Sequence, residues 1–423
     1  MLGMRRSLVA VVVVLAAAAA TTACGAGSSK HDEDLTGAAR GDLLLLDTGS
    51  GIRLARASTG EAILDAPGGV ANPAADTIAA ASIDGNTTTL RTFDATTGEV
   101  NSSVRLDGRL AVRAVSDDGA HVALLPPTDA DAWTPVPRAT TEVVVADVSS
   151  SEAPARFRLR GNYEPEAFSI DARSLYLISY VPPTDPAAYR VEALDLAKGG
   201  VSDVFGRFKV PPETMSGTRL TQVAAPDDGR LYTLYTNQPA AYAAGAQADA
   251  PGAAMENDVA FVHTLSLGDG WAFCADLPDP FGVGDLDAKA IAVSPDGRFV
   301  YVVDTERGLV ATMSAKRLEA SEARPVDLGL AGGGPTSAEI GPDGALYVGR
   351  GTGVVAVDPR SLAVERRWSV GGPVTGLAFS PDGARLYAAE GGRIELLDAA
   401  SGTSLGTTSA PGAVGILSVR PSP

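Results

Sequence analysis

Short, uninterrupted apolar runs recur along the chain and are separated by polar segments rich in glycine and aspartate. Typical runs are LLLL at 43–46, VYVV at 300–303 and VVAV at 354–357. Apolar runs without polar alternation are typical of β-strands that are covered on both faces. No long segment has the apolar period of an amphipathic helix, which argues against an α/β fold. We therefore expect an all-β protein.

One phrase of the sequence recurs and organises the chain. The segments AIAVSPDGRFVYVVD (290–304) and GLAFSPDGARLYAAE (376–390) each contain an apolar strand, a Ser-Pro-Asp-Gly turn and a second apolar strand. Related strand pairs with more variable turns lie at 68–82, 111–125, 166–179, 221–236 and 337–350. A second kind of strand pair, joined by an Asp-led turn, lies at 89–100, 353–365 and 393–405. Asp and Gly suit such turns because Asp accepts local backbone hydrogen bonds and Gly tolerates positive φ.

The two kinds of strand pair together predict a unit of four antiparallel strands, a to d, and a ring of such units is a β-propeller. Residues 413–422 match a strand a with no strand b after it, whereas residues 42–64 match strands b, c and d. We therefore expect the two ends of the chain to share one blade, which closes the ring. This blade and the seven strand pairs give eight blades, or seven if the loosely matching pair at 68–82 is not one.

The Ser-Pro-Asp-Gly phrases followed by tyrosine, together with the Asp-led turns, resemble the YVTN and WD40-like propeller proteins of bacteria. The resemblance extends over residues 42–423 and implies the propeller architecture. It implies little about activity, because such repeats occur in binding proteins, assembly scaffolds and some enzymes.

The first residues have the features of a secretory signal peptide. Arg5 and Arg6 precede an apolar, alanine-rich run from Leu8 to Ala20, which is too short for a stable membrane span. Thr21-Thr22-Ala23-Cys24-Gly25 then resembles the lipobox of bacterial lipoproteins. That resemblance implies cleavage after residue 23 and a lipid on Cys24, so that the mature protein is anchored to the cell membrane on its extracytoplasmic side.

Residues 24–41 are small, polar and charged, and we expect them to form a lipidated, flexible tether between the membrane and a propeller at 42–423. The formal net charge of −17 makes nucleic acid an improbable partner, because phosphate binding requires a basic surface. An acidic body is also repelled by anionic lipid headgroups. The membrane is therefore expected as a partner only through the lipid on Cys24.

No catalytic or metal-binding motif is evident, and we predict no catalytic residues, no metal and no cofactor. His31, His121 and His263 have no ligand spacing, and the last two are expected in a strand b and a strand c. We expect Cys274 to act as a small apolar side chain in a strand d; nucleophilic chemistry there would require a nearby histidine.

Asp47-Thr48-Gly49 reads like the catalytic loop of a pepsin-like protease, but such enzymes need two facing carboxylates. The chain has no second Asp-Thr-Gly or Asp-Ser-Gly, so Asp47 is expected in a turn between strands b and c.

Two enzyme families provide an alternative interpretation. Asp94 and Gly98 fit the blade pattern of quinoprotein dehydrogenases, although the tryptophan that locks the blades in that family does not follow them. Lactonase propellers bind metal or substrate in the central channel through side chains from several blades. In both cases the active site would lie in the central channel, and three or more converging carboxylates there would favour an enzyme.

Long connections predict where a binding module would contact its partner. In a propeller the b-to-c and d-to-a connections emerge on one face, and this set contains the insertions 126–141, 181–189 and 237–259, extended by 211–217 and 280–287. Loops that a compact fold does not need are commonly functional, although tolerated insertions are the alternative. The candidate binding residues are Trp133, Tyr189, Tyr242 and Met255, since aromatic rings supply large contact areas at low entropy cost. We therefore expect a binding or scaffold module for a protein, small-molecule or glycan ligand.

Overall fold

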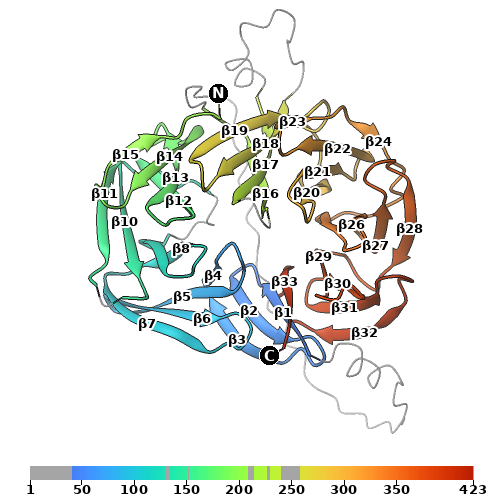
Figure 1. Ribbon diagram of the computed structural model, residues 1–423, viewed down its shortest axis with the longest axis horizontal. Coiled ribbons are helices and arrows are strands. Elements are labelled where there is room, and N and C mark those ends of the chain that lie inside the picture. The colour runs from blue at the N-terminus through green and yellow to red at the C-terminus, as the bar shows by residue number, and fades with distance from the viewer. Residues whose placement is uncertain are drawn as a thin grey trace, which may run out of the picture.

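The computed structural model describes residues 41–128, 134–150, 152–207, 214–225, 229–239 and 258–422. The described chain is almost entirely β-structure, with one short 3₁₀ helix, η1 (Leu286–Ala288). No helix in these ranges is long and apolar enough to cross a membrane. The strands form eight sheets arranged around a centre, which confirms the predicted eight-bladed β-propeller (Figure 1).

Each blade is written here from its innermost to its outermost strand, and the strands are antiparallel throughout. Blade 1 contains β4 (Val70–Ala71), β5 (Thr77–Asp84), β6 (Thr87–Asp94) and β7 (Val100–Asp107). Blade 2 contains β8 (Ala111–Val115), β9 (His121–Leu125), β10 (Thr140–Asp147) and β11 (Ala155–Arg160). Blade 3 contains β12 (Asn162–Phe168), β13 (Ser174–Val181), β14 (Ala188–Asp195) and β15 (Val201–Asp203). Blade 4 contains β16 (Thr218–Ala224), β17 (Arg230–Gln238), β18 (Val259–Ser266) and β19 (Trp271–Asp276).

Blade 5 contains β20 (Lys289–Val293), β21 (Phe299–Asp304) and β22 (Leu309–Ser314), with both β23 (Glu319–Ala320) and β24 (Arg324–Pro325) paired to β22. Blade 6 contains β25 (Ser337–Ile340), β26 (Leu346–Arg350), β27 (Gly353–Val357) and β28 (Val364–Ser369). Blade 7 contains β29 (Gly376–Phe379), β30 (Arg385–Ala389), β31 (Arg393–Asp398) and β32 (Ser404–Ser409). Blade 8 contains β33 (Gly415–Pro421), β1 (Asp42–Asp47), β2 (Gly51–Arg56) and β3 (Ala62–Pro67).

Blade 8 is built from both ends of the chain, as the sequence predicts. Strand β33 is its innermost strand and pairs with β1, with Leu45 opposite Ser418 (Figure 1). Since β1 is hydrogen-bonded on both sides, to β33 and to β2, it presents no free edge. The ring is thus closed by main-chain pairing between residues that are far apart in the sequence.

The continuous apolar runs are explained by packing between blades. Leu44 and Leu46 pack with Tyr387 and Ile394 of blade 7, whereas Leu43 and Leu45 pack with Ile78 of blade 1. All four leucines of β1 are buried. Because both faces of each sheet are covered by a neighbouring sheet, side chains of either parity must be apolar.

The predicted turn chemistry is present at both ends of the blades. In the Ser-Pro-Asp-Gly turn, Ser294 Oγ donates to Asp296 Oδ1 at 2.7 Å and accepts the Phe299 N–H at 2.9 Å. The Ser294 hydrogen bond, with others from Arg298, lowers the pKa of Asp296 to about 2. Asp47 is the last residue of β1, the second strand of blade 8, and accepts the Gly49 N–H at 2.7 Å in the turn to β2, which confirms its predicted place at the turn between strands b and c.

Candidate functional site

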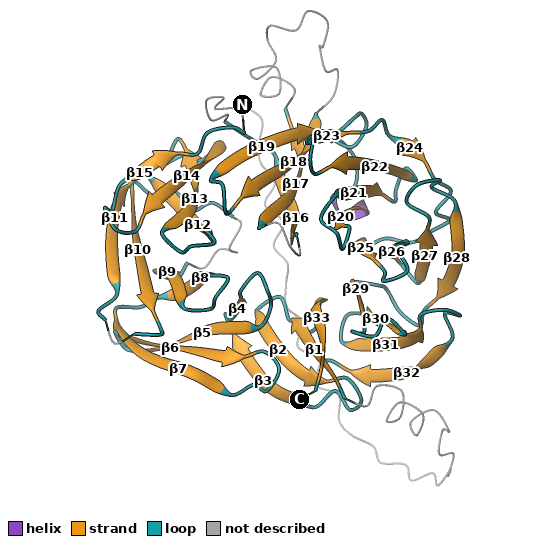
Figure 2. Cartoon of the chain, in the orientation of Figure 1, coloured by secondary structure: helices purple, strands orange, loops and turns teal. Residues whose placement is uncertain are grey.

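We use the term insertion face for the side of the propeller where second strands connect to third strands and where one blade connects to the next. On this face β9 connects to β10 through 126–139, β13 to β14 through 182–187 and β17 to β18 through 239–258. These connections belong to the consecutive blades 2, 3 and 4, which lie side by side (Figure 2). The described ends of the three connections, which leave out 129–133 and 240–257, therefore lie on the same side of three neighbouring blades.

Most of the candidate binding residues lie outside the described part of the chain. This is the case for Trp133, Tyr242 and Met255, and also for Cys24. Tyr189 is described, but it is not on a projecting loop as the sequence suggests. It lies in β14 opposite Tyr180 and is only 7 % exposed, because the β13–β14 pairing extends as far as Val181 and Ala188. Its role in binding stays a prediction.

Tyr189 instead forms a wall of a pocket between blades 3 and 4, which we call the tyrosine pocket. Its cavity measures about 170 Å³. The rings of Tyr180 and Tyr189 meet edge to face at 6.3 Å, and those of Tyr189 and Tyr235 lie 5.2 Å apart. The pocket is lined by Pro135, Ile178, Tyr180, Pro186, Ala187, Ala188, Tyr189, Ser216, Gly217, Arg219 and Tyr235. Residues from the connections of blades 2 and 3, from the link between blades 3 and 4 and from strands β16 and β17 therefore converge on one cavity.

Charged side chains of the innermost strands support the pocket. Arg219 in β16 donates from Nη1 to Glu166 Oε2 in β12 at 2.8 Å, and Gln222 donates to the other oxygen of Glu166 at 2.5 Å. Burial, reinforced by Glu164 and Glu166, raises the pKa of Tyr180 to about 12. The Tyr180 hydroxyl therefore keeps its proton at neutral pH and can donate a hydrogen bond to a ligand.

The described end of the first insertion is fastened to blade 3. Asn162, at the start of β12, donates from Nδ2 to the carbonyls of Val136 and Pro183 at 2.9 and 3.1 Å. Arg138 bonds to Asn162 Oδ1 and to Glu164 Oε2, both at 2.9 Å. Burial raises the pKa of Glu164, although Arg113 and Arg138 oppose this shift. Residues 134–139 are thus held against blade 3 by polar contacts to the buried Asn162 and Glu164.

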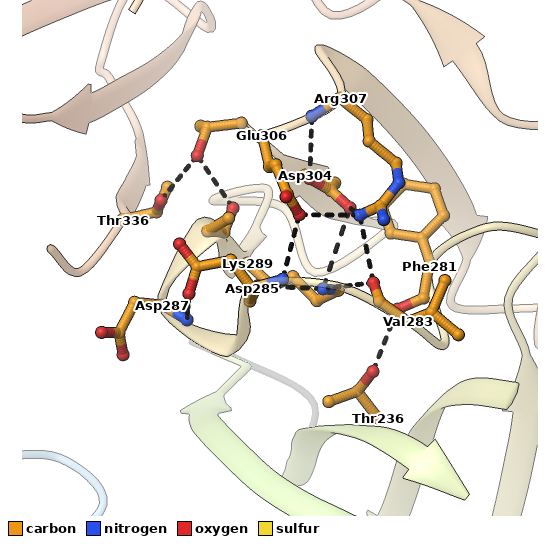
Figure 3. Close-up of polar contacts among 12 residues, drawn as sticks. Thr236, Phe281, Val283, Asp285, Asp287, Lys289, Asp304, Glu306, Arg307 and Thr336 are labelled. Atoms are coloured by element: carbon orange, nitrogen blue, oxygen red, sulfur yellow. Dashed lines mark hydrogen bonds and ion pairs between the residues drawn. The ribbon is translucent and has the colours of Figure 1, made fainter. Parts of the chain in front are cut away.

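The segment 280–287, which the sequence adds to the same face, is held by a buried ionic network on blade 5 (Figure 3). Lys289 Nζ donates to the carbonyls of Val283 and Asp285 at 2.9 and 3.0 Å and lies 3.8 Å from Asp304 Oδ2. Arg307 Nη1 contacts the same Asp304 oxygen at 3.1 Å. Burial lowers the pKa of Lys289, and Asp304 opposes this shift. The network fixes the backbone of the insertion face next to blade 4.

A histidine lies beside Cys274, a contact that was not expected from the sequence. Cys274 in β19 and His263 in β18 are directly opposite in the antiparallel register, with Sγ and Nδ1 3.5 Å apart. The pairing could have been found, because both residues are equally distant from the Gly268-Asp269 turn that joins strands c and d. Among the described residues, however, no three His, Cys, Asp or Glu side chains converge as a metal site would require.

The innermost strands of the described chain carry three acidic side chains, which are the candidates for an active site in the central channel. Glu164 and Glu166 of β12 are both paired with arginines, whereas Glu339 lies in β25 of blade 6. Burial raises the pKa of Glu339 to about 7.

Comparison with known proteins supports the fold and nothing more specific. No protein-family model matches the sequence, and no curated protein matches it. The solved structure of the dihydro-heme d1 dehydrogenase NirN in complex with DHE is similar with a TM-score of 0.52 and 14 % identity, over 90 % of this chain and 75 % of that chain. AztD from Citrobacter koseri has a TM-score of 0.38 and 15 % identity, over 78 % of this chain and 80 % of that chain. TolB from Acinetobacter baumannii has a TM-score of 0.34 and 15 % identity, over 67 % and 64 %. The NirN likeness agrees with the propeller fold, and identities this low say nothing of activity.

Proposed function

We propose that the protein is an extracytoplasmic lipoprotein with YVTN or WD40-like propeller repeats, tethered to the cell membrane through Cys24. The support is the order of the first residues: a basic start, a short apolar run and small residues before Cys24. Residues 24–41 would separate the lipid from the propeller. Cys24→Ala should then lose metabolic lipid labelling and leave the membrane fraction. Wild-type labelling and detergent partitioning of this variant would exclude the anchor.

The propeller itself is, in this proposal, a binding module whose contact surface is the insertion face. The observation that carries this proposal is the tyrosine pocket, where the connections of blades 2 and 3 meet the link from blade 3 to blade 4. A cavity of about 150 Å³ can hold a benzene ring, so this pocket has room for one ring-sized group. Tyrosine rings offer flat apolar faces and protonated hydroxyls, and Arg219 and Glu166 add polar groups at the wall. This chemistry fits a sugar ring of a glycan. Trp133, Tyr242 and Met255, in the adjoining connections, would extend the contact.

The test uses the full chain in detergent micelles and a panel of mono- and disaccharides, with binding measured by saturation-transfer NMR and calorimetry. Ala187 is exposed at the mouth of the pocket, and Ala187→Trp should weaken binding at least about tenfold by filling the mouth. Thr184→Trp is the matched control, because Thr184 is exposed in the same connection but does not line the pocket. Equal binding by the two variants would place the ligand elsewhere, and a panel without any binder would exclude the sugar.

A channel enzyme of the lactonase or quinoprotein kind is the second candidate. It is favoured by Glu339, because a carboxyl group whose pKa is raised to about 7 can exchange protons at neutral pH. Lactone hydrolysis by the wild type that is lost in Glu339→Gln would support this candidate. The same assay without any turnover would leave the binding module as the better proposal.

A further inference from the structure

Three side chains of the types that bind soft metal ions meet between blades 3 and 4, next to Tyr189 of the tyrosine pocket. Cys274 Sγ lies 3.2 Å from Met215 Sδ and 3.5 Å from His263 Nδ1. Met215 and His263 are each 4 % exposed, and Cys274 is partly buried. Around them pack apolar residues of both blades, including Tyr189 and Phe261. A thiol, a thioether and an imidazole are thus gathered in one apolar environment.

Main-chain pairing holds the backbone at each of the three donor residues. His263 and Cys274 are partners in the β18–β19 ladder. Met215 belongs to the connection from blade 3 to blade 4 and forms an isolated bridge with Tyr189, whose two hydrogen bonds measure 2.7 and 2.8 Å. Donors held by main-chain pairing in this way are organised before any ligand arrives, which lowers the entropic cost of binding.

The chemistry of the three donors selects the metal. Thiolate and thioether sulfur are soft ligands that prefer Cu(I), and imidazole also binds copper. His263 is only 4 % exposed and its Nδ1 faces Cys274 Sγ at 3.5 Å, so this nitrogen lies where it can bind the same ion. One thiolate with Cu(I) carries no net charge, whereas Zn²⁺ or Cu²⁺ would leave a positive charge in an apolar site at considerable cost.

We propose that Cys274, Met215 and His263 form a binding site for one Cu(I) ion. On binding, the thiol releases its proton to solvent and the ion gains one bond from each of the three donors, with no change in oxidation state. Metal–donor bonds of about 2.0 to 2.3 Å in a trigonal site require donor separations of roughly 4 Å, so the distances of 3.2 and 3.5 Å from Cys274 Sγ to the other two donors need to widen by less than about 1 Å. The flexible side chain of Met215 can supply this movement. The site does not depend on the proposed binding of sugars.

The experiment titrates the full chain in detergent micelles, without oxygen, with Cu(I) delivered as its bicinchoninate complex. We expect the wild type to withdraw one Cu(I) per chain and to give an X-ray absorption spectrum with two sulfur ligands and one nitrogen ligand. Cys274→Ser should lose this uptake, and Met215→Leu should bind at least about tenfold more weakly. Met313→Leu is the matched control, because Met313 is buried in blade 5 away from the site. Cys24→Ser, which removes the other cysteine of the sequence, should bind as the wild type does.

Three results would overturn the proposal. The first is unchanged uptake by Cys274→Ser, and the second is a wild-type spectrum that contains only nitrogen and oxygen ligands. Displacement of Cu(I) by an equal concentration of Zn²⁺ would show that the site prefers a different metal and would refute the assignment. The wild-type spectrum decides the question even if a variant unfolds, and thermal unfolding of the two Met→Leu chains shows whether both remain folded.

Discussion

Asp47 and Asp304 end the second strand of their blades at equivalent positions, but their surroundings differ. Asp47 accepts a backbone hydrogen bond in a surface turn, whereas Asp304 is fully buried beside Lys289 and Arg307. Asp304→Asn should lower the free energy of unfolding by about 3 kcal/mol, because it leaves a buried cation without its counter-charge. Asp47→Asn should lower it by no more than about 1 kcal/mol. Urea unfolding followed by circular dichroism measures both, and equal losses would contradict this difference.

The buried imidazole of His263 predicts a pH dependence of stability. Burial lowers its pKa from 6.5 to about 4 in the folded chain, so the unfolded chain binds more protons between these values. The stability that His263 contributes is complete above pH 6.5 and is lost as the pH falls towards 4, by about 3 kcal/mol in total. His263→Gln should remove this dependence, and His121→Gln serves as control. The measurement is the difference in unfolding free energy between wild type and variant, and a difference that stays constant from pH 7.5 to 4 would refute it.

At the scale of elements, we expect the fold not to depend on residues 240–257 of the connection between β17 and β18. Gln238 and Val259 are still paired at its ends. Replacing 240–257 by a short Gly-Ser linker should therefore change the unfolding free energy by no more than about 1 kcal/mol, since loop closure depends weakly on length. Saccharide binding should be lost if this connection, with Tyr242 and Met255, contributes to the ligand site. Calorimetry with the saccharide panel, beside urea unfolding, tests both statements. Full binding by the shortened chain would limit the site to the tyrosine pocket.

The elements were largely predictable from the sequence, while contacts between them were not. Hairpins such as 290–304 and 376–390 are specified by local turn chemistry and apolar runs, which a repeat makes visible. The Arg219–Glu166 pair joins innermost strands of two blades, and Met215 approaches Cys274 across a blade boundary. Such contacts depend on how neighbouring sheets pack, which no spacing along one strand encodes. The expected place of Tyr189 on a loop is wrong for a related reason, because β14 begins at Ala188, inside the predicted insertion 181–189, and Tyr189 pairs there with Tyr180.

The whole molecule depends on the pairing of its two ends in blade 8. Without residues 415–423, β1 would lose its inner partner and present an open edge beside the buried leucines 43–46. Strand β33 also pairs along the whole length of β1, from Asp42 to Asp47. We expect this truncation to lower the free energy of unfolding by more than about 4 kcal/mol, far above an ordinary surface change. The exposed edge should also promote self-association by strand pairing.

Urea unfolding and light scattering after gel filtration measure these two effects of the truncation. Removal of Ser422 and Pro423 alone is the control, since it leaves every β1–β33 pair in place. A synthetic peptide of residues 412–423 should restore the monomer and much of the lost stability, because an added strand can pair with an open sheet edge. A peptide with proline at Ser418, opposite Leu45 in the middle of the ladder, should restore less, since proline cannot donate a ladder hydrogen bond. If the truncated chain remained monomeric with an unchanged unfolding midpoint, closure by the termini would not be what holds the ring together.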